Sequence, residues 1–292
     1  MSGDAGAPKA PGSLVGMSEA DLRNLRDPML GMAFSGWSDA AQSASEAADH
    51  IVSQYDGQVA ASIDPNEYYD FQSSRPMVSL DNDGERVISW PSTEIVVCHL
   101  PMRDVVVVRG PEPNFRWPSF AAALSALITI AEPELVIVLG ALLSESPHSR
   151  PVPISLSSGD VAVRERYGAE RSTYEGPTGI HGIMVQACQI SGIPTVSVWA
   201  ACPHYVASPP NPKATLAILS RLEDLLGGPI DLGDLAARAE LWERSVDDLA
   251  ADDPDVAEYI ANLESASDAR EPEPSGDAIA AEFQRYLRRR DQ

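Results

Sequence analysis

The sequence predicts an α/β fold with a mainly parallel or mixed central sheet flanked by helices. Two runs, Val105–Val108 and Leu135–Leu139, are continuously apolar, which is typical of strands buried on both faces. Helical patterns alternate with such runs, and this alternation favours a largely parallel sheet. The clearest expected strands are Met29–Phe34, Val59–Ile63, Arg86–Trp90, Glu94–Leu100, Val105–Arg109, Leu135–Leu139 and Thr195–Trp199.

Four helical patterns separate these strands. Ser38 is a suitable N-cap for the first, and Pro118 suits the first turn of the second. The third extends from about Gly179 to Ile190. The fourth has the clearest boundaries, because Asn211 can cap its start and Gly227 can end it.

Composition divides the chain of 292 residues into three parts. Residues 1–16 are rich in Gly, Ala, Pro and Ser, and we expect a disordered tail. Residues 17–230 form the expected α/β domain. Residues 231–292 carry 17 acidic and 7 basic residues and form an expected helical extension. Its helices are predicted at Asp231–Ala250, from Pro254, and around Ile279 to Leu287.

The charge of the chain excludes some classes of partner. Its 43 acidic and 21 basic residues give a net charge of −22, which disfavours nucleic acid and anionic membrane surfaces. The three cysteines form no Cys-x-x-Cys pair, so we expect a reducing compartment without a disulfide framework. No signal peptide pattern opens the chain, and no apolar run reaches the ~18 residues of a membrane span. We therefore expect a cytoplasmic protein.

Polar and aromatic residues follow several expected strands. Ligands of open α/β sheets bind beyond the carboxyl ends of the strands, so these segments define a candidate crevice if the strands are parallel. Another glycine-rich segment, residues 174–182, opens the third helix and can be read as an anion site or as a tight turn. The candidate binding residues are Trp37, Asp39, Glu112, Asn114, Arg116, Glu145, Arg150, Thr178, His181 and His204.

Signals for catalysis are weak. Glu112 and Glu145 could form a carboxylate pair, but capping of helices or pairing with Arg116 and Arg150 is the favoured interpretation. No histidine is placed in the sequence to activate Ser38, and the histidine spacing fits no metal motif. We expect neither a metal nor a cofactor.

An aromatic segment, residues 68–76, lies outside the candidate crevice. It contains Tyr68, Tyr69, Phe71 and Arg75. Tyrosine and arginine are enriched at protein interfaces, so an interface is the preferred interpretation. Packing of this segment over its own sheet is the alternative.

Five ordered motifs resemble the proteasome assembly chaperone 2 family, and more narrowly its bacterial branch. They are residues 36–40, 68–76, 110–117, 174–179 and 203–206, within a match from about residue 29 to 228. The resemblance implies an α/β fold related to nucleoside phosphorylases and peptidyl-tRNA-hydrolase-like proteins. It also implies homo-oligomers, often trimers, and a protein-binding role. The family supplies no catalytic residues for this chain.

The end of the chain departs from this family. Relatives that dock into proteasome pockets end in a hydrophobic residue, Tyr and any residue, whereas this chain ends Arg290-Asp291-Gln292. Tyr286 lies six residues from the end, which argues against proteasome docking by that route. The sequence favours a non-catalytic, oligomeric protein-binding scaffold with an unknown protein partner. The alternative is a binding protein for a nucleoside, nucleotide or anion, or a hydrolase- or phosphorylase-like enzyme, using the strand-end crevice.

Overall fold

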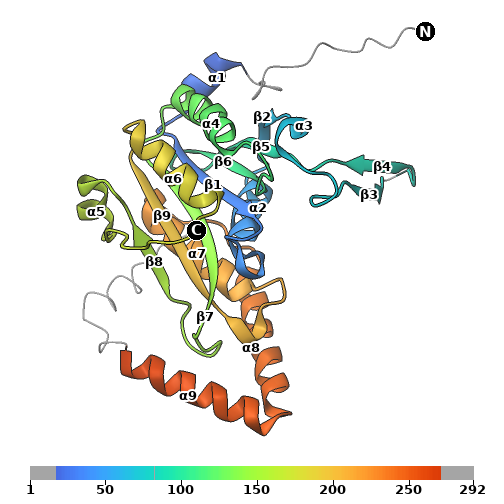
Figure 1. The fold of residues 1–292 in the computed structure, drawn as a ribbon, viewed down its shortest axis with the longest axis vertical. Coiled ribbons are helices and arrows are strands. Elements are labelled where there is room, and N and C mark those ends of the chain that lie inside the picture. The colour runs from blue at the N-terminus through green and yellow to red at the C-terminus, as the bar shows by residue number, and fades with distance from the viewer. Residues whose placement is uncertain (1–17, 82, 271–292) are drawn as a thin grey trace.

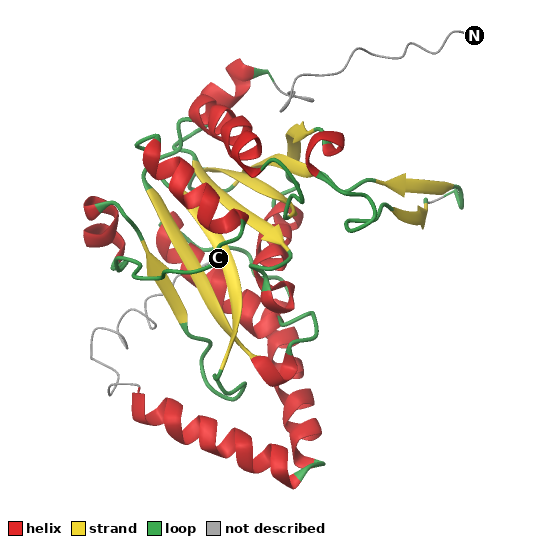
Figure 2. Ribbon diagram, viewed as in Figure 1, coloured by secondary structure: helices red, strands yellow, loops and turns green. Residues whose placement is uncertain are grey.

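A computed structural model describes residues 18–81 and 83–270, and its centre is a seven-stranded mixed sheet (Figures 1 and 2). The strands are β1 (Met29–Ser35), β2 (Gln58–Ile63), β5 (Thr93–His99), β6 (Asp104–Pro111), β7 (Val136–Ser144), β8 (Ile154–Ser157) and β9 (Thr195–Pro203). Their order is β2-β5-β6-β1-β7-β9-β8. The four central strands β6, β1, β7 and β9 are parallel. Strands β5 and β8 flank them as antiparallel neighbours, and β2 pairs antiparallel with β5 at the edge. The predicted fold class is confirmed.

Helices cover both faces of this sheet. They are α1 (Glu19–Arg23), α2 (Ser43–Gln54), α3 (Pro65–Tyr68), α4 (Trp117–Ala131), α5 (Val161–Tyr167), α6 (Ile180–Ile190), α7 (Pro212–Leu226), α8 (Leu235–Ala251) and α9 (Pro254–Arg270). One apolar core lies between the sheet and α1, α4 and α6, and the other lies between the sheet and α2 and α7 (Figure 1). Alternate β1 residues serve the two cores, since Met32 belongs to the first and Ala33 to the second. This explains the continuous apolar runs in the sequence.

The remaining two strands form a separate hairpin. Strand β3 (Met77–Leu80) pairs with β4 (Arg86–Ser89) in a two-stranded antiparallel sheet. Figure 1 shows this hairpin projecting from the body. The run Arg86–Trp90 is therefore a strand, as predicted, but it pairs outside the central sheet. Its hydrophobic residues gave the strand pattern, and that pattern does not identify the pairing partner.

The first helix begins differently from the prediction. A 3₁₀ turn at Ala40–Gln42 precedes α2, and the side chain that bonds the first turn of α2 is Asp39 instead of Ser38. The Asp39 carboxylate accepts hydrogen bonds from the backbone N–H groups of Ala44 (2.7 Å) and Ser45 (3.4 Å). A carboxylate at this end also opposes the positive pole of the helix, so aspartate is the better cap.

The boundaries of α7 are confirmed. The Asn211 side chain accepts a hydrogen bond from Ala214 N (3.0 Å), and Gly227 ends the helix with a φ of 78°. Pro118 lies in the first turn of α4 and α6 ends at Ile190, as the sequence predicts. Helices α8 and α9 form the two described helices of the acidic extension, whereas the expected third helix and tail 1–16 lie outside the described residues. Within the described ranges, no helix has the length and hydropathy needed to cross a membrane.

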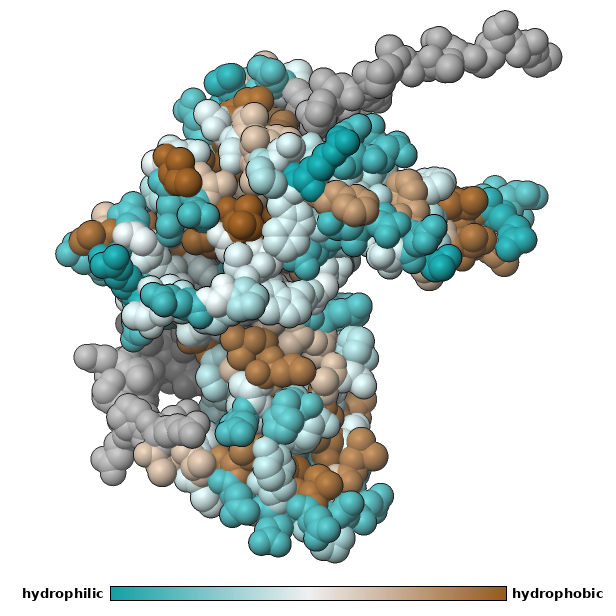
Figure 3. Space-filling view, in the orientation of Figure 1, coloured by the Kyte–Doolittle hydropathy of each residue, from teal (hydrophilic) through white to brown (hydrophobic). Residues whose placement is uncertain are grey.

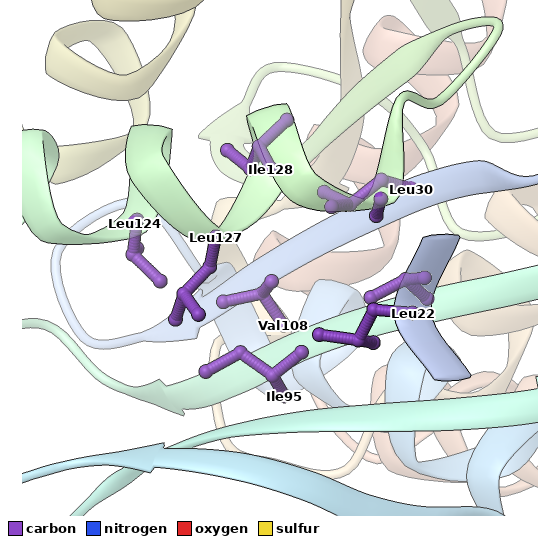
Figure 4. A pocket seen from close by; sticks show the side chains of 9 residues that line it. Leu22, Leu30, Ile95, Val108, Leu124, Leu127 and Ile128 are labelled. Carbon is purple, nitrogen blue, oxygen red and sulfur yellow. The ribbon is translucent and has the colours of Figure 1, made fainter. Parts of the chain in front are cut away.

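Each face of the sheet leaves a small apolar cavity of about 10 Å³. Figure 4 shows the one beneath α4, where Leu22, Leu30, Ile95, Leu124 and Ile128 point toward one another. The cavity on the opposite face has no polar lining either, and a space of this size and character stays dry. Gly31 of β1 lines that second cavity.

The second cavity makes Gly31→Ala a stabilising substitution. A Cβ at Gly31 would have no heavy atom within 4 Å, so the methyl group enters empty space. Burying the methyl group and reducing the entropy of the unfolded chain should together add about 1 kcal/mol. We expect thermal unfolding to show a higher melting temperature by about 2–4 °C.

Gly110→Ala is the matched control for Gly31→Ala. Gly110 has a φ of 159°, and a Cβ there would lie 2.5 Å from the Ser92 carbonyl oxygen. This variant should unfold at a lower temperature. A fall in the melting temperature of Gly31→Ala would show that the cavity cannot take the methyl group.

Candidate functional site

Side chains beyond β1 and β6 meet at the start of α6. Glu112, just after β6, accepts a hydrogen bond at Oε1 from Ile180 N (2.8 Å) and therefore caps α6. A Cβ at Gly179 would lie 2.7 Å from Glu112 Oε1, 2.9 Å from Ser38 Oγ and 3.1 Å from Trp37 Cε3. The structure thus brings Trp37 and Glu112 together around Gly179, and the Glu112 carboxylate serves the start of α6.

The Asp39 carboxylate binds the backbone at the start of α2. Its side chain is buried, and burial raises its pKa while the hydrogen bonds from Ser45 and Ala44 oppose that rise. The carbonyl of its neighbour Ser38 accepts a hydrogen bond from Ala141 N (2.9 Å), which ties this turn to β7. Asp39 thereby fixes the turn after β1.

His181 is a buried, neutral histidine. Its Nδ1 donates to the Leu139 carbonyl (3.1 Å), its Nε2 accepts from Ser197 Oγ (2.7 Å), and its ring lies 4.3 Å from that of Trp199. Burial lowers its pKa to about 4. Thr178, three residues before it, is exposed. His181 therefore packs α6 onto β7 and β9 and presents no free nitrogen to a ligand.

Asn114 and Arg116 lie with the aromatic segment. Asn114 Oδ1 accepts from Asp70 N (2.8 Å) and Ser74 Oγ (3.1 Å), and Arg116 pairs with Glu67. These contacts hold residues 67–74 against the chain that follows β6. Both candidate binding residues thus have structural partners at this position.

The interface interpretation of the aromatic segment is wrong for its two tyrosines. Tyr68 is 2% exposed, and its ring meets Phe120 edge-on at 5.3 Å. The Tyr69 hydroxyl donates to the Pro111 carbonyl (2.9 Å) and contacts Thr93 Oγ1 (2.7 Å), and burial raises its pKa to about 12. Both rings are large and apolar, so they fill the chain's own core.

The rest of that segment reaches the hairpin. Phe71 is half-buried and packs edge-on against Trp90 at 4.8 Å, at the base of the hairpin. Arg75 is exposed. These two residues keep their candidate role at an interface.

Three candidate residues lie at the far tips of β7 and β9. The register places Leu139 beside Ala33, and β7 continues to Ser144, so Glu145 lies well beyond the end of β1. Arg150 forms a two-point ion pair with Asp268 of α9 (2.7 and 2.9 Å). His204 contacts the Ser144 carbonyl (3.1 Å) and the Tyr259 hydroxyl (3.4 Å). The structure does not bring Glu112 and Glu145 together.

A polar cluster that sequence reasoning missed holds the acidic extension. His148 is 2% exposed, its Nδ1 accepts from the Tyr205 hydroxyl (2.8 Å), and its Nε2 donates to Asp247 of α8 (3.0 Å). Lys213 Nζ donates to Glu243 of α8 (2.6 Å). The partners are up to 99 residues apart, so no spacing in the sequence could reveal them.

The described residues contain no cluster of His, Cys, Asp and Glu suited to a metal ion. Burial raises the pKa of Cys98 and of Cys188 to about 11 and raises that of Cys202 as well, so these thiols stay protonated at neutral pH. The crevice offers carboxylate caps and packed rings. Fold and contacts together define an α/β protein in which Asp39, Glu112 and His181 bond to its own backbone.

The β3–β4 hairpin carries a group of exposed apolar side chains. All eight residues of its two strands are exposed. Val78 pairs with Ile88, so these side chains share one face with Leu80, while Met77 and Val87 lie on the other. Figure 3 shows hydrophobic side chains gathered over the projecting hairpin.

Comparisons with known proteins agree with this description. The model of the PAC2 family matches residues 33–250. A PAC2 family protein from Streptomyces avermitilis shares 49% identity over 80% of this chain and 99% of its own, with a TM-score of 0.75. A proteasome-assembly chaperone homologue from Mycobacterium tuberculosis shares 42% identity over 80% of this chain and 99% of its own, with a TM-score of 0.72.

This chain belongs to the PAC2 family. The archaeal protein PbaA from Pyrococcus furiosus, a homologue of a proteasome-assembly chaperone, has the same fold. It is 15% identical over 89% of this chain and 100% of its own, with a TM-score of 0.58. No curated protein sequence matches the chain. The expected family is confirmed.

Proposed function

We propose that this protein is a non-catalytic, homo-oligomeric scaffold that binds other proteins and assists their assembly. Two relatives, from Mycobacterium tuberculosis and Pyrococcus furiosus, are described as homologues of proteasome-assembly chaperones. The committed hydrogen bonds of Asp39, Glu112 and His181 support a role without catalysis. Three buried free cysteines suit a reducing, cytoplasmic location.

The observation that carries this proposal is the β3–β4 hairpin. A two-stranded hairpin alone is marginally stable in water, and this one has apolar side chains on both faces. Exposed apolar patches of this kind mark interaction sites. The exposed apolar side chains of the hairpin need a partner that is available as soon as the chain folds. A second copy of the same chain is always available. We therefore assign the hairpin to the contact between copies, and a trimer is the stoichiometry that the resemblance implies.

The double substitution Val78→Ser with Ile88→Ser tests this assignment. Both side chains are about half exposed on one face of the hairpin, so the change removes apolar contact area without opening the core. Light scattering should give an integral multiple of 31.3 kDa for the natural chain, three for a trimer, and the mass of one chain for the variant. The melting temperature of the separated chain's core should stay within about 3 °C, because surface changes cost little.

Leu249→Ser is the control for the hairpin variant. Leu249 on α8 is 68% exposed and also apolar, but it lies outside the hairpin. Its mass should equal that of the natural chain. A natural chain of single-chain mass, or a hairpin variant that keeps the full mass, would contradict the assignment.

The assembly role needs a separate experiment. Separately purified α and β subunits of a bacterial 20S proteasome would be mixed with and without this protein, and the yield of complete particles measured by native gel. We expect a higher yield of complete particles with the protein present than without it. An unchanged yield would remove the proteasome as the client while leaving the oligomer result intact.

A further inference from the structure

A polar groove lies at the β8 edge of the sheet and extends along α6. It has a volume of about 390 Å³. This falls in the range of sites that bind small molecules. Its walls are the end of β8, the segment after α5, and one face of α6, with the lining residues Ser157, Ser158, Gly159, Arg171, Ser172, Gly182, Val185, Gln186 and Gln189.

Backbone contacts fix two walls of this groove. Glu170 N donates to the Leu156 carbonyl and Ser158 N donates to the Glu170 carbonyl, both at 2.9 Å, so the segment carrying Arg171 is held along β8. Arg164 Nη1 donates to the carbonyls of Ser158 (3.1 Å) and Gly159 (2.8 Å). These hydrogen bonds therefore hold two walls of the groove in place.

The third wall is a regular face of α6. Gly182, Gln186 and Gln189 follow one another at helical spacing, so their side-chain positions face the same way. Gln189 lies against Gly159, where a Cβ would be 2.8 Å from its Nε2. The amide groups of Gln186 and Gln189 are exposed and make no hydrogen bond within the described part of the chain. They are available to a ligand.

The charge of the groove is opposite to that of the whole protein. Among the described residues that line it, none is acidic, although the chain carries a net charge of −22. The neighbouring Asp160 carboxylate caps α5 through Ala162 N (2.8 Å). Arg171 is exposed and makes no ion pair or side-chain hydrogen bond with the described residues. The guanidinium group is thus free to bind an anion.

We propose that this groove binds a small organic anion, a carboxylate or a phosphate monoester, with Arg171 as its anchor. A guanidinium group contacts either anion through two parallel N–H donors. The glutamine amides and the Ser157 and Ser172 hydroxyls supply further hydrogen bonds around it. The inference does not depend on the hairpin or on protein assembly.

The test uses the full chain with succinate, glycerol 3-phosphate and inorganic phosphate as probes, each at 10 mM and matched ionic strength. Isothermal titration calorimetry should give a Kd below 1 mM for at least one organic probe. Arg171→Gln should weaken that binding at least tenfold. The probe that binds more tightly distinguishes a carboxylate ligand from a phosphate ester, and binding of inorganic phosphate alone would overturn the inference.

Arg238→Gln is the matched control, because Arg238 is an exposed arginine on α8 and does not line the groove. It should bind the probe as the natural chain does. Gly159→Ala should also weaken binding, since its Cβ pushes the Gln189 amide from its position. No binding by the natural chain, or equal losses in Arg171→Gln and Arg238→Gln, would overturn the proposal.

Discussion

A chain that ends at Ile230 is expected to aggregate or to unfold far below the melting temperature of the full chain. Leu235 belongs to the core beneath α7, and Ala239 and Val246 of α8 are buried. Truncation exposes the surface that they cover and leaves His148 without Asp247. We therefore propose residues 17–230 and 231–292 as two parts, with α8 of the second completing the core of the first.

A pair of point variants measures the same contact without truncation. Val246→Asp places an unpaired carboxylate at a site 5% exposed, and the combined loss of apolar burial and of hydration should cost about 3 kcal/mol or more. Leu249→Asp, three residues on, changes a side chain that is 68% exposed and should cost less than about 0.5 kcal/mol. Urea unfolding followed by circular dichroism compares the two.

Equal stabilities of Val246→Asp and Leu249→Asp would show that α8 does not cover the core in solution. A soluble truncated chain with an unchanged melting temperature would agree with that result. In either case the acidic extension would be an independent helical arm.

The strands and the long helices could be predicted because the signal for each lies in residues that are consecutive in the sequence. The apolar runs of β6 and β7 extend over consecutive residues, and α7 has Asn211 and Gly227 at its two ends. Strand β8 has four residues of alternating Ile, Ser, Leu and Ser, too short to distinguish from a loop. The extra length of β7 beyond Leu139 depends on pairing with β9, whose register extends to Ser144 beside Pro203.

The candidate site was less predictable, because its contacts join distant parts of the chain. Arg150 and Asp268 are separated by 118 residues, and Arg116 meets Glu67 across 49. A polar residue after a strand looks the same in sequence whether it binds a ligand or holds another segment. Tyr69 shows this ambiguity, since a ring suited to an interface is equally suited to a core.

Acid should destabilise this protein through His181. The ordinary histidine pKa of 6.5 is lowered to about 4 by burial in the folded chain. Above pH 6.5 neither state binds the proton. Between pH 6.5 and 4 the unfolded chain binds it and the folded chain does not, so the free energy of unfolding falls as pH decreases. At about 1.4 kcal/mol per pKa unit, the loss attributable to this group approaches about 3 kcal/mol near pH 4 and grows no further below it.

His181→Gln isolates this contribution, because glutamine keeps a donor and an acceptor for Leu139 and Ser197 but does not titrate. Urea unfolding at pH 7.5 and 4.5 should show a loss smaller by about 2–3 kcal/mol in the variant than in the natural chain. Asp39→Asn should act in the opposite sense: burial raises the pKa of Asp39, so the folded chain takes up that proton first and gains stability as pH falls. If His181→Gln lost as much stability in acid as the natural chain, the imidazole would be accessible to protons in the folded state, and its place between α6 and the β7–β9 ladder would be more open than its 3% exposure indicates.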